Sequence, residues 1–413
     1  MEKRIQIPKT WIAISILLIM AGSLLAHFFN TSAYNVQVTE ISFQTDKGML
    51  NGLLYLPKDA GPADPRPTII TTHGYLNAKE MQDAPAIEMS RRGFVVLALD
   101  MYAHGDSYLD SVPLSNPFFA FWTTAMNDAV QYMYNQPYVL KDKAGNAKIA
   151  VSGHSMGGFS STMAAAMDEQ AYQKNLTEGT PAVRKIAAVL TAGSDFRWTS
   201  YLGIDAKAYN AGLANRTAGA IAAQYDEFFF EASAYATGNT MVKKDYANTA
   251  DGMEFLGNPA DPKEGVFFST PAGGKRIIYQ PKETHPWNHF SIKTTAYEIQ
   301  FYNAAFEGSV PKTSISGTGQ IWRLKEYSEF IAALIIAIVS LVKRKEEKAF
   351  LGWIITSIGA FLVFGLTVGA GNVFKLSPYF NEPQTNAVIF WAVFVVDSLS
   401  FYKRKFKSCR INV

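Results

Sequence analysis

The sequence predicts an α/β protein with a mostly parallel central sheet, joined at both ends to apolar segments of membrane-spanning length. Three observations carry this prediction. Short apolar strands alternate with helical stretches through the middle of the chain, a Gly-x-Ser-x-Gly motif lies between a strand and a helix, and long runs without charged residues lie near both ends. Strands that alternate with helices are joined by crossover connections and pair in parallel.

The composition excludes a disordered chain and indicates apolar segments. Of the 413 residues, 48% are hydrophobic and only 18% are charged, whereas globular proteins have about 25% charged residues. The single cysteine, Cys409, lies near the C-terminus. The rest of the chain must therefore be stabilised by a packed core rather than by disulfide bonds.

Charge-free runs predict transmembrane helices. The run 11–29 has 19 residues, close to the roughly 20 that cross a bilayer as a helix. Runs at 349–374 and 385–402 predict two more spans, the last interrupted only by Asp397. The run 330–342 is short, so it is either a fourth span or a buried helix. Asp397 is either a functional intramembrane group or a residue that reaches the interface.

Basic clusters predict the topology. Residues 3–9, 343–348 and 403–410 hold 12 of the 38 basic side chains, and short basic loops stay in the cytoplasm. We therefore expect both termini inside and the middle of the chain outside. A cleaved signal peptide is the alternative for the N-terminus. Residues 10–342 carry 25 basic and 30 acidic side chains, so no nucleic-acid partner is implied.

These patterns divide the chain into three parts: an N-terminal flank and membrane anchor (1–30), an exported α/β domain (31–325), and a C-terminal membrane region with three predicted spans and a basic tail (326–413). Within the exported domain, the segment 228–271 is longer than a minimal connection and predicts a cap. The predicted location is the membrane, with the α/β domain outside the cytoplasm.

The exported domain is expected to open with two antiparallel strands, at 35–43 and 50–56, around a turn signal at 46–48. A Pro-rich loop at 57–67 follows. Helices are expected near 84–92 and 123–134, after the Gly-x-Ser-x-Gly motif, and from Ser291, which can cap the last one. Further strands are expected at 68–72, 94–99, 148–152, 186–191, 218–224 and 275–280. In a parallel sheet the chemistry lies at the carboxyl ends of the strands.

The candidate nucleophile is Ser155. It lies in Gly153-His154-Ser155-Met156-Gly157-Gly158, which follows the strand 148–152 and precedes a helix. A serine at so sharp a turn takes a strained backbone conformation that lifts its hydroxyl out of the sheet. The neighbouring glycines leave room for the adjacent strand and helix, and the helix N-terminus favours the negative charge that develops on reaction.

Three motifs, each after a predicted strand, resemble those of the α/β-hydrolase fold family. Residues 72–75 (Thr-His-Gly-Tyr) resemble its His-Gly oxyanion turn, residues 99–107 its Asp-x-x-x-His-Gly-x-Ser loop, and residues 153–158 its nucleophile elbow. The resemblance covers nearly the whole exported domain and is nearest to esterases, dienelactone-hydrolase-like enzymes and serine peptidases. It implies an oxyanion hole formed by the backbone N–H groups of Tyr75 and Met156.

The same resemblance separates structural histidines from catalytic ones. His73, His104 and Asp100 are interpreted as residues that fix loops, and His154 as a residue that packs beside the elbow. The catalytic acid should follow the strand after 186–191. Asp226 follows the predicted strand 218–224 directly and is therefore our choice.

Alternatives for the acid and the base stay open. Asp195 and Glu227 are the other candidate acids, because Ala-Gln-Tyr-Asp departs from the family's Gly-x-x-Asp pattern. His285 and His289 lie between the last strand and the closing helix, where this fold has its base. The spacing from the strand favours His285 as the base, and His289 would then hold the loop.

The sequence thus predicts a membrane-anchored serine hydrolase that cleaves a carboxylic ester, a thioester or a peptide through an acyl-enzyme. Its partner would be a small-molecule or peptide acyl substrate. Neither a cofactor nor a metal is expected, because no His/Cys cluster has ligand spacing. The aromatic runs 117–122 and 228–230 are either an acyl pocket or core. The alternative function, prompted by the large C-terminal membrane region, is a catalytically silent receptor or assembly module. Substrate identity and oligomeric state are not determined by the sequence.

Overall fold

Strands and helices alternate through the described part of the chain. The computed structural model describes residues 9–110, 117–196, 199–200, 203–230, 243–310, 315, 321–325 and 327–328. Residues from Leu24 to Ser328 belong to one unit, and of the other unit only the first part of one helix is described.

The helices are α1 (Lys9–Asn30), α2 (Asp83–Ser90), α3 (Pro117–Tyr134), α4 (Met156–Glu178), α5 (Ala206–Gly212), α7 (Ala250–Leu256) and α8 (Ile292–Ala305), with 3-10 turns η1 (Lys79–Gln82), η3 (Tyr246–Asn248) and η4 (His285–Phe290). The strands are β1 (Val36–Gln44), β2 (Gly48–Pro57), β3 (Thr68–Thr72), β4 (Val95–Leu99), β5 (Tyr108–Leu109), β6 (Ile149–His154), β7 (Ile186–Ala192), β8 (Thr217–Ile221), β9 (Phe268–Ser269) and β10 (Lys275–Tyr279).

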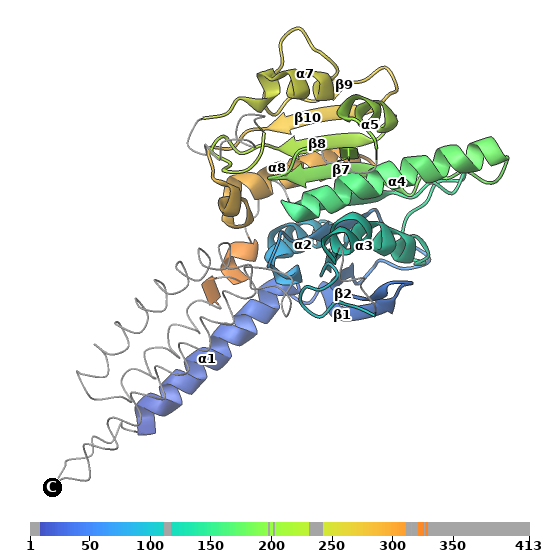
Figure 1. Cartoon of the computed structure of the whole chain (residues 1–413). Helices are drawn as coiled ribbons and strands as arrows, with labels where there is room; N and C mark the ends of the chain where they lie inside the picture. The colour runs from blue at the N-terminus through green and yellow to red at the C-terminus, as the bar shows by residue number, and fades with distance from the viewer. Residues whose placement is uncertain are drawn as a thin grey trace, which may run out of the picture. The chain divides into compact units, whose positions relative to one another are not determined.

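All these strands form one sheet, in the order β1-β2-β4-β3-β6-β7-β8-β10-β9, with β5 paired to β2. The strands β4, β3, β6, β7, β8 and β10, which are neighbours in this order, are parallel to one another. In contrast, β2 is antiparallel to both β1 and β4. The predicted antiparallel start and mostly parallel sheet are confirmed (Figure 1). This arrangement brings the carboxyl ends of β3, β6, β7, β8 and β10 to one edge, where functional groups are expected.

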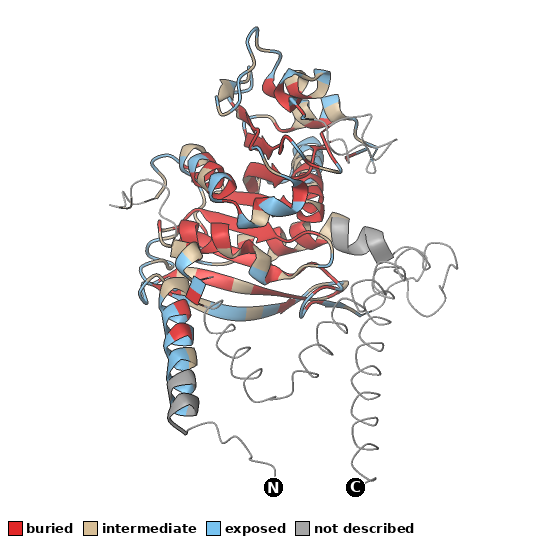
Figure 2. Ribbon diagram, turned by 90° about the vertical axis from the view of Figure 1, so that its left-hand side faces the viewer, coloured by how far each residue is buried: buried red, intermediate tan, exposed pale blue. Residues whose placement is uncertain are grey.

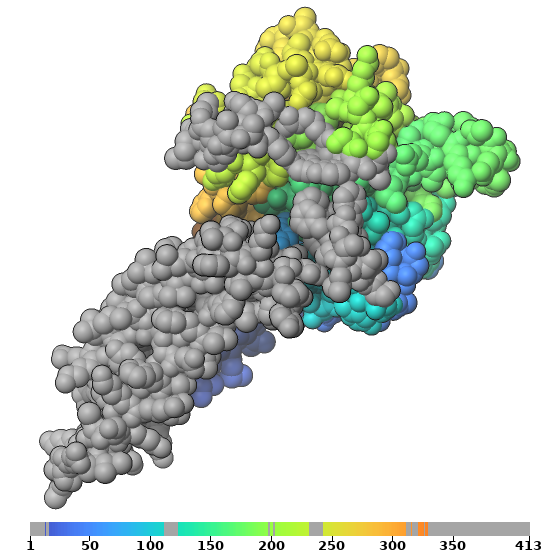
Figure 3. All heavy atoms as spheres, in the orientation of Figure 1, coloured from blue at the N-terminus to red at the C-terminus, as the bar shows by residue number. Residues whose placement is uncertain are grey.

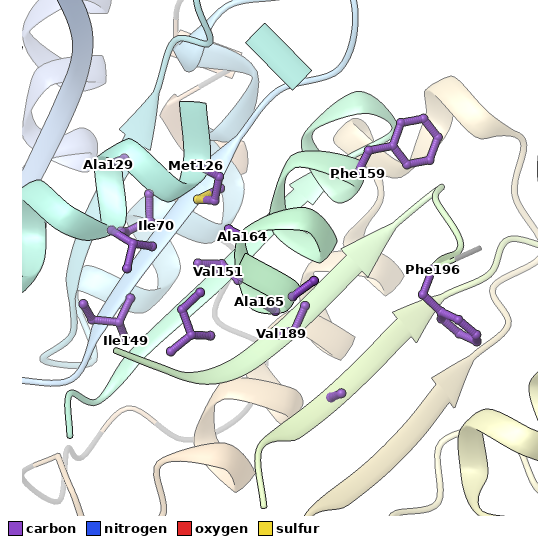
Figure 4. Packing of buried hydrophobic residues seen from close by; sticks show 14 of the residues in the cluster. Ile70, Met126, Ala129, Ile149, Val151, Phe159, Ala164, Ala165, Val189 and Phe196 are labelled. Atoms are coloured by element: carbon purple, nitrogen blue, oxygen red, sulfur yellow. The ribbon is translucent and has the colours of Figure 1, made fainter. Parts of the chain in front are cut away.

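The sheet separates two apolar cores, because successive side chains of a strand point to opposite faces. Ile70 and Val151 pack with Met126 of α3 and with α4 on one face (Figure 4). Ile69, one residue earlier, packs with Phe301 of α8 and with α2 on the other. The central strands are buried on both faces (Figure 2), which explains why they appear in the sequence as continuous apolar runs.

Element bounds differ from the predictions mainly where loops bond to neighbouring strands. The expected strand 68–72 coincides with β3, but β8 ends at Ile221 rather than at 224. Beyond it, the N–H of Gln224 donates to the carbonyl of Pro281 at 2.9 Å. The N–H of Ala222 likewise donates to the carbonyl of Tyr279 at 2.7 Å, so the chain continues beside the end of β10 as it approaches Asp226. The last helix begins as predicted, with Ser291 Oγ accepting from the N–H of Lys293.

The predicted cap at 228–271 is described only outside residues 231–242. From residue 243 onward it extends the edge of the sheet: β9 pairs antiparallel with β10, and α7 contacts α5 and β10. Figure 1 shows α7 and β9 beyond β10, at the edge of the sheet. The described part of the segment is thus an edge extension, because its backbone and apolar side chains find partners there.

The predicted first span coincides with α1 (Lys9–Asn30). Within the described residues, no helix combines the length and the apolar character needed to cross a bilayer. The predicted spans 330–342, 349–374 and 385–402, together with Asp397 and Cys409, lie outside the described residues.

Candidate active site

Ser155 lies at the sharp turn between β6 and α4. Its backbone has φ 53° and ψ −114°, a conformation that costs a non-glycine residue about 1–3 kcal/mol. The turn is held by the Ser155 N–H, which donates to the carbonyl of Ala192 at 2.8 Å. A Cβ on Gly153 would lie 2.4 Å from the carbonyl carbon of Gly157, and a Cβ on Gly157 would lie 2.4 Å from the carbonyl oxygen of Thr72. Both positions therefore require glycine.

The predicted oxyanion turn lies against this serine. A Cβ on Gly74 would be 3.3 Å from Cβ of Ser155, so the loop after β3 passes directly beside the elbow. Tyr75 follows Gly74, and Met156, the residue after Ser155, is the first residue of α4. N–H groups in the first turn of a helix have no partner within the helix. The structure thus places Gly74, the residue before one predicted donor, against Ser155, and Met156, the other predicted donor, directly after it.

The histidines at 73 and 104 fix the loops around the site, as predicted. Buried His73 donates from Nδ1 to the carbonyl of Gly74 at 2.7 Å, and its Nε2 accepts from the N–H of Met101 at 3.1 Å. Burial lowers the pKa of His73 to about 3, so its ring is neutral. His104 accepts on Nε2 from the N–H of Leu76 at 3.2 Å. Both rings hold the oxyanion turn in place.

Asp100 holds the loop after β4. Its fully buried carboxylate accepts from the N–H of Lys79 at 2.7 Å, from Lys79 Nζ at 2.8 Å and from the N–H of Asp106 at 3.0 Å. These bonds tie η1 to the loop that carries His104. A side chain so fully engaged is a structural residue, which agrees with its predicted role.

Asp226 and His285 meet although they are far apart in the sequence. Oδ2 of the fully buried Asp226 lies 2.8 Å from Nδ1 of His285. Its Oδ1 accepts from the N–H groups of Phe228 and Phe229, at 2.8 and 2.9 Å. Three donors therefore fix the carboxylate. Glu227 accepts from the backbone N–H of His285 at 2.7 Å, so it supports the loop and not the ring.

Among the alternatives, the structure separates the two late histidines. His285 lies on the carboxylate of Asp226, whereas the ring of His289 packs on that of His154, with centroids 4.0 Å apart. Burial lowers the pKa of His289 to about 4. Asp195 is fully buried after β7, one strand before Asp226. No hydrogen bond joins the Ser155 hydroxyl to His285 among the described residues, and such bonds often form only when substrate is bound.

His154, the residue before the candidate nucleophile, contacts the backbone of the candidate base. Its Nε2 lies 2.8 Å from the carbonyl oxygen of His285. Because a carbonyl only accepts, His154 Nε2 carries the hydrogen. Burial holds the pKa of His154 well below its usual range. A Cβ on Gly193 would lie 3.0 Å from His154 Nε2 and from His285 Nδ1, so a glycine there makes room for both rings. Sequence reasoning missed this contact.

A small polar cavity lies behind these histidines. It has a volume of about 20 Å³ and is lined by His154, Asn288, His289 and Glu298, among others. That is room for about one water molecule. His154 Nδ1, His289 Nε2 and Asn288 Oδ1 are buried without a hydrogen-bond partner, and burial raises the pKa of Glu298 to about 8. Within the described residues, no group of three His, Cys, Asp or Glu side chains is arranged to hold a metal ion.

Aromatic side chains surround His285. The rings of Phe228 and Phe229 lie 5.0 and 5.4 Å from its ring, and Phe159 of α4 lies 5.4 Å from Phe229. Phe230 turns inward against Tyr246. Of the predicted aromatic run 228–230, the first two residues thus border the site and the third belongs to the core. The side chains of 117–122 lie outside the described residues.

The strand order and the strained serine at the turn from β6 to α4 define an α/β-hydrolase fold. A family model described as serine aminopeptidase, S33, matches residues 63–198 and supports an α/β-hydrolase family. The matched part contains the oxyanion turn, the Asp100 loop and the elbow, and it ends before Asp226 and His285. No match was found among curated proteins.

Solved structures that resemble the chain include Est1E from Butyrivibrio proteoclasticus (15% identity, 65% of this chain and 98% of that chain, TM-score 0.42). Others are Thermogutta terrifontis esterase 2 (16%, 67% and 97%, TM-score 0.41) and dienelactone hydrolase from Anabaena variabilis (14%, 67% and 100%, TM-score 0.38). Because each TM-score is below 0.5, the fold assignment rests on this chain's own strand order.

Proposed function

We propose that this chain is a serine hydrolase with Ser155 as nucleophile, His285 as general base and Asp226 as the acid that orients the base. The observation that carries the proposal is the 2.8 Å contact between His285 Nδ1 and Asp226 Oδ2, beside a serine in a strained turn. A carboxylate on Nδ1 holds the proton on that nitrogen, which leaves Nε2 free to accept the serine proton. In the proposed mechanism His289 is not the base. Its ring packs on that of His154 and supports the loop.

In the proposed reaction, Ser155 Oγ attacks the carbonyl carbon of the substrate as His285 Nε2 takes the hydroxyl proton. The tetrahedral oxyanion accepts hydrogen bonds from the N–H groups of Met156 and Tyr75. The bond to the leaving group then breaks, and the proton on His285 passes to that group. Water next gives a proton to His285 and attacks the acyl-enzyme, which releases the acid and returns the proton to Ser155.

The chemistry fits carboxylic esters, thioesters and peptides, because each has an electrophilic carbonyl and a leaving group that accepts a proton. Phe228 and Phe229 next to His285 favour a substrate with an apolar acyl group on that side. An ester is the simplest such substrate, since its alcohol leaves more readily than an amine. The ester is therefore the substrate that we propose to test first.

A fluorophosphonate probe tests the proposal. The probe should label the full chain at Ser155, and Ser155→Ala should abolish labelling. Asp226→Asn should fold and label far more slowly, because the acid no longer holds the hydrogen on Nδ1. Labelling that persists in Ser155→Ala would refute the assignment. Failure of the unsubstituted protein to label, or to turn over any activated ester, would favour a catalytically silent receptor or assembly module.

We also propose that the hydrolase domain is held at a membrane outside the cytoplasm. The support is the sequence: charge-free runs at 330–342, 349–374 and 385–402, with basic clusters at 343–348 and 403–410 that favour the cytoplasmic side. The run 330–342 must then cross the membrane, which leaves the domain before it outside. Protease added to intact cells should cut the domain but leave a tag after residue 413 protected. Recovery of the protein in a wash with alkaline carbonate would contradict the membrane assignment.

A further inference from the structure

Large apolar side chains are exposed around the loop that carries His285. Single exposed apolar residues are ordinary, but a contiguous group marks a surface that contacts something apolar. Trp287 is 54% exposed, Ile292 50% and Phe290 39%. Phe228, 56% exposed, packs edge-on against the histidine ring, with centroids 5.0 Å apart. The apolar surface thus begins at the candidate base itself.

The segment after α8 extends this surface. Arg323 Nη2 donates to the carbonyl oxygen of Phe290, which brings the segment around Arg323 beside η4. Leu324 and Tyr327 in this segment are 42% and 56% exposed. We call the whole group the apolar rim. It consists of Phe228, Trp287, Phe290, Ile292, Leu324 and Tyr327.

Both ends of the Leu24–Ser328 unit meet near this rim. Asn30, the last residue of α1, accepts from the hydroxyl of Tyr55, which also donates to Asp83 at 3.1 Å. Lys325 pairs with the same carboxylate of Asp83. Asp83 begins α2 two residues after Met81, whose backbone bonds to His289. The chain therefore enters and leaves the unit on the side that carries the candidate active site.

The sequence beyond these two exits is apolar. Leu24, Leu25 and Phe28 at the end of α1 are exposed, and the run 330–342 begins two residues after Ser328. The exposed apolar rim and these apolar stretches of the sequence favour the same kind of surroundings. Trp, Phe and Tyr beside Lys and Arg are typical of the boundary between lipid and water. Exposed Lys282 and Lys293 flank the rim in the sequence and suit anionic headgroups.

We infer that the apolar rim lies on a lipid bilayer and that the substrate is a carboxylic ester of a membrane lipid. The reaction rests on the proposed function: Ser155 takes the acyl group from the lipid, the lipid alcohol leaves with the proton from His285, and water releases a fatty acid. A bilayer at the rim presents acyl chains beside Phe228 and Phe229. The ester then passes from lipid to serine without exposing its chain to water.

A depth measurement tests the rim without relying on activity. In a Cys409→Ser background, Trp287→Cys or Leu176→Cys is labelled with an environment-sensitive fluorophore. Leu176 is the matched control, because it is 58% exposed on the end of α4 that projects from the domain (Figure 3). The full chain is placed in vesicles of phosphatidylcholine and phosphatidylglycerol that contain spin-labelled lipid. We expect lipid-borne quenching at 287 and none at 176.

Equal quenching at both positions, or none at 287, would overturn the inference. A probe at 287 that is shielded from aqueous iodide yet unquenched by the lipid would show that protein covers the rim, either a second copy or another part of this chain. That result would also overturn it. Because quenching needs no turnover, it tests whether the rim lies on lipid even if the protein has no hydrolase activity.

A kinetic measurement tests the substrate class. The ratio of kcat/KM for a vesicle-borne diacyl lipid to that for a short soluble ester should fall roughly 10-fold or more in Trp287→Ser/Ile292→Ser, the effect expected for loss of one large buried apolar contact. Leu176→Ser should leave the ratio unchanged. An unchanged ratio in the double variant would overturn the inference. Absence of turnover of both substrates in the unsubstituted protein would instead count against the proposed function.

Discussion

His154 Nε2 donates to the carbonyl oxygen of His285 at 2.8 Å. The residue that precedes the candidate nucleophile thus holds the backbone of the residue that supplies the candidate base, 131 positions later in the sequence. Asp226 fixes the ring of His285 and His154 fixes its main chain. The distance between serine and base is therefore set from both ends, by the elbow itself.

Replacement of His154 should slow catalysis as well as destabilise the folded state. In His154→Phe the carbonyl of His285 loses its donor, and an unsatisfied buried acceptor costs about 1–3 kcal/mol. We expect kcat for an activated ester to fall roughly 10-fold with little change in KM. His154→Gln retains an N–H donor and should recover part of the rate. Steady-state assays with an activated ester measure kcat of both variants, and thermal unfolding is the control for stability. Equal kcat in the two variants would contradict the prediction.

The two late histidines should differ sharply. His285→Ala removes the proposed base and should lower kcat on the order of 10⁴-fold or more, as in other triads. His289→Ala removes a ring that packs on His154 and should mainly lower the melting temperature. Turnover is measured per folded molecule, with the folded fraction taken from thermal unfolding of each variant. The reverse outcome would move the base to His289, and near-normal turnover in both variants would overturn the triad.

Substitution of a glycine at the elbow should disrupt the fold, because the backbone of β3 leaves no room for a side chain there. In Gly157→Ala the new Cβ would lie 2.4 Å from the carbonyl oxygen of Thr72, so β3 and α4 must separate. We expect loss of fluorophosphonate labelling and a lower melting temperature. Gly61→Ala is the control, because no atom lies within 4 Å of its Cβ position. A stable, labelled Gly157→Ala protein would show that the elbow differs from this geometry.

The free energy of unfolding should decrease as the pH rises, because of Glu298. Burial raises its pKa from 4.5 to about 8, so the folded state keeps a proton that the unfolded state releases across this range. Stability is then fully present below pH 4.5 and is lost as the pH rises towards 8, by at most about 1.4 kcal/mol per pH unit. Urea unfolding between pH 6.5 and 8 measures the slope. Glu298→Gln should flatten it, and an unchanged slope would assign the effect elsewhere.

Local patterns predicted the parts of the site that local chemistry determines. The strand 68–72 and the elbow at Ser155 depend on short apolar runs and on glycines that no other residue can replace, and both are visible in the sequence. The order of acid and base along the chain ranked Asp226 and His285 ahead of their neighbours. The structure brings these two side chains together.

What the sequence could not predict depends on contacts between distant residues. The strand β8 is shorter than predicted, and the residues after it are held by hydrogen bonds to the end of β10 and the loop that follows it, about which propensity contains no information. The bond from His154 to His285 is likewise non-local. The helix α7 and strand β9 were missed because each is short and is stabilised by packing at the sheet edge rather than by its own pattern.

The position of Trp322 sets a practical limit on how the domain can be prepared. Its side chain is buried in the same core as Phe94 and Phe306, and the N–H of Ile321 donates to the buried carboxylate of Glu88 at 2.7 Å. A recombinant fragment cut directly after α8 would open this core to water and take a donor from a buried charge. A fragment for crystallisation has to continue to Ser328, although the last regular helix of the hydrolase fold ends at Ala305.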